Sequence, residues 1–86
     1  MKIEILKDEK KNLEVQIDNL TIAEILRVYL QKDSDVEFAA WKREHPSEAP
    51  VLKIETKTKT AKKALQNAIS LIEKEADKLV AEAKKL

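Results

Sequence analysis

The 86-residue sequence contains no glycine and no cysteine, and it has only one Trp, one Tyr and one Phe. Without glycine, the glycine-rich loops that bind phosphates and dinucleotides are excluded. Tight turns that need a positive φ must then use asparagine or aspartate, and we expect Asn12, Asn19 or Asp33 there. Without cysteine there is neither a disulfide framework nor a thiolate metal site, which favours a reducing, cytoplasmic location.

Long apolar runs and an excess of one charge are also missing. No run approaches the roughly 20 residues of a membrane-spanning helix, and the first residues do not resemble a signal peptide. The 17 basic and 16 acidic residues nearly cancel, so no global field directs the protein to nucleic acid or a membrane. The length predicts a single domain over residues 1–86.

The longest pattern is helical and begins after Thr60, a natural N-cap. Its apolar residues recur at alternating steps of four and three and form one stripe: Leu65, Ile69, Ile72, Ala76, Leu79, Ala83 and Leu86. Such a helix is roughly 40 Å long, whereas a compact domain of this size is about 25 Å across. We therefore expect another chain to cover the far end, although monomeric domains also use long amphipathic helices.

Two alternating runs, 2–7 and 13–17, flank a polar turn and predict a β-hairpin with one apolar face. Ile3 and Ile5 belong to that face. Two further extended stretches follow later in the chain, at 35–45 and 51–57. In the first of these, Val36, Phe38 and Ala40 alternate with Glu37, Ala39 and Trp41, so that Trp41 falls on the second side.

A shorter helix is predicted over residues 21–32. Thr21 with Glu24 three residues later matches a capping box, and Leu20 with Ile25 matches a hydrophobic staple. The element order is therefore β-β-α-β-β-α. We predict an α+β fold, a four-stranded and mostly antiparallel sheet with both helices on one face and a long C-terminal helix.

Residues 35–46 (DVEFAAWKREHP) closely resemble archaeal DNA-directed RNA polymerase subunit L. The preceding Leu26-Arg27 and Leu30-x-Lys32-Asp33 and the following Val51–Thr56 extend the match, which covers essentially the whole chain. This family is similar to a small subunit of the eukaryotic polymerases and to the dimerisation domain of the bacterial α subunit. The sequence departs from it at Glu24, where the family often has Asn, and in a shorter approach to the first helix that lacks His.

The resemblance implies a subunit of the nucleotidyltransferase complex that has no catalytic site of its own. It implies pairing with the larger D-type subunit of the polymerase through the first and last helices. The pair would form the platform for the large catalytic subunits in transcription, and Arg27 matches a residue that contacts a large subunit in the bacterial relatives. The same surfaces could pair two copies of the isolated chain.

We expect the partner interface to use apolar residues of the two helices: Ile22, Ile25, Leu26, Tyr29, Ile72, Leu79, Val80 and Leu86. No cofactor or metal is expected, because the single histidine, His45, lies in a proline turn with no second His or Cys to complete a site. Ser, Asp and Glu residues form no catalytic motif.

An alternative function rests on the basic stretch from Lys53 to Lys63. Its alternating lysines could contact phosphates in a small free-standing nucleic-acid-binding module. Against this, no aromatic residue is interleaved for base stacking. The same lysines also suit an edge strand that resists pairing with other sheets.

Overall fold

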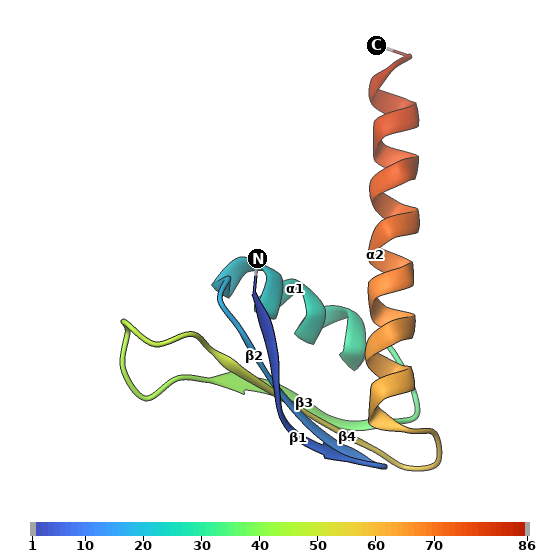
Figure 1. Ribbon diagram of the computed structural model, residues 1–86. Helices are drawn as coiled ribbons and strands as arrows, with labels where there is room; N and C mark the ends of the chain where they lie inside the picture. Colours follow the sequence, from blue (N-terminus) through green and yellow to red (C-terminus); the bar gives the residue numbers. More distant parts are fainter. Residues whose placement is uncertain (1, 86) are drawn as a thin grey trace.

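The computed structural model describes residues 2–85. The elements are β1 (Ile3–Glu9), β2 (Asn12–Ile17), α1 (Leu20–Gln31), β3 (Val36–Lys42), β4 (Val51–Thr56) and α2 (Ala61–Ala83). Figure 1 shows α1 lying across one face of the sheet, while α2 begins at the sheet and rises away from it. The predicted α+β class and element order are confirmed.

The four strands form one antiparallel sheet in the order β1-β2-β4-β3. β4 is therefore a central strand, bonded to β2 on one side and to β3 on the other. The interpretation of the Lys53 region as an edge strand is wrong, because both backbone edges of this strand are already paired.

The core lies between the sheet and the two helices. Alternation along β2 and β4 places Leu13, Val15, Ile17, Leu52 and Ile54 on the covered face, each with at most 1% of its surface exposed. The helices contribute Ala23, Leu26 and Leu30 from α1, and Ala61, Ala64 and Ala68 from α2. Burial of such apolar surface is the main favourable term in folding.

β1 and β2 form the predicted hairpin with one apolar face. Ile3 and Ile5 pair with Ile17 and Val15 and so share their side of the sheet. They nevertheless remain 46% and 52% exposed. They stay exposed because β1 is an edge strand and neither helix packs closely over it. A register shift then follows between Ile5 and Lys7, which interrupts the alternation at Leu6.

β3 carries a second register shift, between Val36 and Phe38. Ala39 and Trp41 lie opposite the buried Ile54 and Leu52, and Val36 lies opposite the buried Thr56. Val36 therefore shares the covered side with Trp41, while Phe38 and Ala40 lie opposite residues of the uncovered face. The predicted grouping of Val36 with Phe38 is wrong, because a bulge breaks strict alternation.

The cap of α1 also differs from the prediction. Asn19 is the N-cap, and its side-chain oxygen accepts from the Ile22 amide at 3.1 Å. Thr21 lies inside the helix, so the predicted capping box is wrong. Within residues 2–85 no residue has a positive φ, which overturns the expectation for Asn12, Asn19 and Asp33. The cap predicted for α2 is confirmed, since the Thr60 hydroxyl accepts from the Lys63 amide at 3.1 Å.

Candidate partner interface

The first half of α2 is attached to the body of the domain. Ala61, Ala64 and Ala68 are buried, and Leu65 and Ile69 are half-buried beside them. Alanine leaves the helix backbone close to the strands and to the end of α1. The amide of Ala61 donates to the Lys10 carbonyl at 2.8 Å, and Lys62 pairs with Asp8 at 3.0 Å. The base of α2 is thereby held on the β1–β2 turn.

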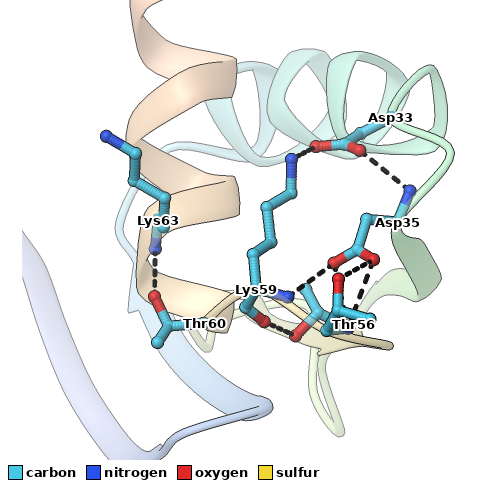
Figure 2. A network of polar contacts seen from close by, with 7 residues as sticks. Asp33, Asp35, Thr56, Lys59, Thr60 and Lys63 are labelled. Atoms are coloured by element: carbon cyan, nitrogen blue, oxygen red, sulfur yellow. Dashed lines mark hydrogen bonds and ion pairs between the residues drawn. The ribbon is translucent and has the colours of Figure 1, made fainter.

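A polar network fixes the chain just before α2 (Figure 2). The Asp35 carboxylate accepts from the Lys59 amide at 2.9 Å and from the Thr58 hydroxyl at 2.7 Å. Lys59 forms an ion pair with Asp33, and the Thr56 hydroxyl donates to the Lys59 carbonyl. This network joins the α1–β3 connection to the β4–α2 connection, so it helps to set the direction in which α2 leaves the sheet.

The two carboxylates of this network are held in their charged form. Hydrogen bonding to Lys59 lowers the pKa of Asp33, and the bonds from Thr58 and the Lys59 amide lower the pKa of Asp35. A carboxylate that accepts several hydrogen bonds loses them on protonation. The network is therefore formed at neutral pH.

The second half of α2 has no covering in this chain. Every residue from Glu73 to Lys85 is exposed. Leu79 and Val80 are 68% and 54% exposed, although they are large aliphatic side chains. Figure 1 shows this part of α2 extending beyond α1 and the sheet. We call residues 73–83 the overhang.

α1 carries a second apolar strip, which its own chain covers only in part. Ile22, Ile25 and Tyr29 are half-buried, and Val28 is exposed. The Tyr29 hydroxyl donates to the Glu75 carboxylate at the start of the overhang, and this contact raises the pKa of Tyr29. This contact links the apolar strip of α1 to the overhang of α2.

The predicted interface residues within 2–85 differ in how far their own chain covers them. Ile22, Ile25, Tyr29 and Ile72 are half-buried, and Leu79 and Val80 are exposed. Leu26 is only 3% exposed and packs in the chain's own core, so it supports the surface from beneath. Leu86 lies outside the described residues. Val28 was not among the predicted interface residues. Its apolar side chain, which lies off the main stripe of α1, could have indicated a wider apolar surface.

Arg27 is held by neighbours in its own chain. Its Nε lies 3.1 Å from one oxygen of Glu24, and its Nη1 donates to Gln31 at 3.0 Å. Glu24 also accepts from Trp41 Nε1 at 2.6 Å. The bonds from Arg27 and then from Trp41 lower the pKa of Glu24 to about 2. Glu24 and Trp41 thus hold Arg27 at the side of α1.

The basic stretch forms no continuous patch. Lys59 and Lys62 are paired with Asp33 and Asp8. Lys53 lies on the uncovered sheet face opposite Glu14. The remaining lysines are divided between the β4–α2 connection and the first turn of α2. The phosphate-binding alternative is therefore not favoured.

Two further kinds of feature are absent from the described part of the chain. Among residues 2–85, no cluster of His, Cys, Asp and Glu side chains is arranged to hold a metal ion. Neither helix within that range has the length and apolar character needed to cross a membrane.

The fold defines a class: small α+β domains with a four-stranded antiparallel sheet, one helix across a face of that sheet and a long C-terminal helix. Residues 4–82 match the family model described as the RNA polymerase Rpb3/Rpb11 dimerisation domain. The chain belongs to the RNA polymerase Rpb3/Rpb11 dimerisation domain family.

Similar proteins agree with this membership. The chain is 37% identical to DNA-directed RNA polymerase subunit Rpo11 of Sulfurisphaera tokodaii, over all of this chain and 97% of the relative. It is 38% identical to Rpo11 of Sulfolobus acidocaldarius over the full length of both. The crystal structure of subunit L from Thermoplasma acidophilum superposes with a TM-score of 0.87 at 22% identity. That superposition covers 98% of this chain and 86% of the other, and it shows the shared fold.

Proposed function

We propose that this chain pairs with a D-type subunit through the overhang of α2 and the apolar strip of α1. The resulting heterodimer is the platform on which the large catalytic subunits assemble. The chain is itself a non-catalytic subunit of an archaeal-type DNA-directed RNA polymerase and serves transcription, in keeping with its family and its full-length Rpo11 relatives.

The main support for this pairing surface is the exposure of Leu79 and Val80, which lie on a helix that continues past its own domain. Burying one such side chain contributes about 1.5–3 kcal/mol before the costs of association. Several of them along two helices supply enough for a stable pair. Isolated chains can use the same surface for a weaker self-association.

Co-expression with a D-type subunit, followed by size and mass measurement, tests this proposal. We expect a one-to-one complex for the wild-type chain. Leu79→Asp should weaken that complex by about 100-fold or more, because it removes an apolar anchor and introduces a charge into the contact. The control is Ala81→Asp, which adds the same charge on the opposite side of the overhang.

A well-folded wild-type chain that stays monomeric in the presence of the D-type subunit would contradict the proposal. If the Leu79→Asp and wild-type chains bind the D-type subunit with equal affinity, the overhang is not part of the interface. The proposal also includes a single folding unit over 1–86, a cytoplasmic location and a contact from Arg27 to a large subunit.

A further inference from the structure

Charges on the overhang are sorted by side. At about 100° per residue, the apolar stripe through Ala76, Leu79 and Ala83 has acidic residues on both of its borders. These border residues are Glu73 on one side, and Glu75 and Glu82 on the other. The lysines of the same region lie farther from the stripe than these glutamates: Lys84 lies just beyond Glu73, Lys78 and Lys85 lie beyond Glu75 and Glu82, and Lys74 lies on the opposite side.

The border glutamates are available to a partner. Glu73, Glu75 and Glu82 are all exposed, and none of the ion pairs found within residues 2–85 involves them. Glu75 accepts from Tyr29, at the end of the overhang nearer the domain. A shallow hollow of about 360 Å³ beside Leu79 is lined by Glu75, Lys78 and Glu82. A long side chain from a partner helix could enter this hollow next to the stripe.

Border charges of this kind decide which helices can pair. When two apolar stripes meet, the residues that flank them are brought close together in a partly desolvated rim. Opposite charges there favour the pair, and like charges oppose it. Two copies of this overhang would bring glutamates toward glutamates, whereas a helix flanked by Lys or Arg would match them.

We propose that the overhang selects a partner helix whose apolar stripe is bordered by lysine or arginine, and that its glutamates disfavour pairing with a second copy of this chain. This specificity rests on the proposed pairing function. Glu73 and Glu82 are its main determinants, because Glu75 is already engaged by Tyr29.

The first test uses the complete chain and the D-type subunit. The double variant Glu73→Lys with Glu82→Lys should bind the D-type subunit at least about tenfold more weakly than wild type. Raising the salt concentration should reduce the difference, because exposed charges are screened. Single variants provide a matched control: Glu82→Lys should weaken binding, while Asp77→Lys, the same change away from the stripe, should not.

The second test needs no other protein. An equimolar mixture of wild-type and double-variant chains should form mixed dimers about tenfold more tightly than the wild type pairs with itself. Sedimentation equilibrium with one component labelled measures both values. Two results would overturn the proposed selection by charge. One is wild-type self-association as tight as the mixed dimer, and the other is a double variant that binds the D-type subunit as tightly as wild type does. Failure of the wild-type chain to bind that subunit is a separate result, and it counts against the proposed function instead.

Discussion

The two halves of α2 differ in both composition and surroundings, since charged residues are few in residues 61–72 and make up more than half of the overhang. In residues 61–72 the fully buried side chains are alanines, whereas in the overhang the exposed ones include Leu79 and Val80. Small residues allow the first half to approach the sheet and α1 closely. Large aliphatic residues in the second half have nothing in this chain to pack against. The comparison teaches that alanines make the close contacts that complete the fold, whereas beyond those contacts the same helix leaves Leu79 and Val80 exposed for a partner.

The largest difference in stability should appear when the same charge is placed in each half of α2. Ala68→Asp buries an unpaired carboxylate between α2 and the core, and we expect it to lower the free energy of unfolding by about 3 kcal/mol or more. Ala81→Asp in the overhang should change it by no more than about 0.5 kcal/mol. Urea unfolding followed by circular dichroism, at concentrations where the chain is monomeric, measures both. Similar losses for the two variants would mean that the overhang also contributes to the folded monomer.

A smaller effect is expected at the junction that directs α2. Asp35→Ala removes the acceptor of the Thr58 and Lys59 hydrogen bonds, while leaving the alanines of the first half in place. We expect amide hydrogen exchange in residues 57–63 to accelerate by roughly tenfold. Asp77→Ala on the overhang is the control and should leave that segment unchanged. Unaltered exchange in the Asp35 variant would show that packing alone fixes the junction.

The smallest effect should come from Glu24, which is on α1 and away from both halves of α2. Its pKa is lowered to about 2 from the ordinary 4.5. The stabilisation from the charged form is therefore complete above pH 4.5 and is lost as the pH falls toward 2. The urea midpoint of the wild type should exceed that of Glu24→Gln at neutral pH, and the two should converge in acid. A difference that is independent of pH would exclude the Arg27 ion pair as its source.

Much of the fold could be predicted because the patterns were long. The alternation in β2 and β4 repeats often enough to identify both the strands and their buried side. The stripe of α2 identified the helix, but the side chains buried against the domain are Ala61, Ala64 and Ala68, which lie beside the stripe. The N-cap of α1 was mispredicted because Asn19 and Thr21 are both good capping residues. Backbone hydrogen bonding to the sheet decides between them. The Ile17 and Asp18 amides donate to the Pro50 and Lys2 carbonyls, and the helix begins directly after these bonds.

The candidate surface was only partly predictable. The family resemblance pointed to the first helix, and spacing then assigned both Leu26 and Ile22 to the interface, because both belong to the apolar side of α1. The structure buries Leu26 and leaves Ile22 half-exposed, since the sheet covers only part of a wide apolar arc. The network around Asp35 was not predicted, because its members are distant in the sequence and match no local motif.

By itself, the sequence determined the element types, their order and an apolar stripe too long for the domain, because these depend on local periodicity and helix rise. Only the tertiary structure decided the central place of β4, the uncovered state of Ile3 and Ile5, and the residue at which α2 leaves the sheet. Those features depend on which strands pair and on how closely alanines let a helix approach. Both are contacts between residues far apart in the chain, and no local pattern encodes them.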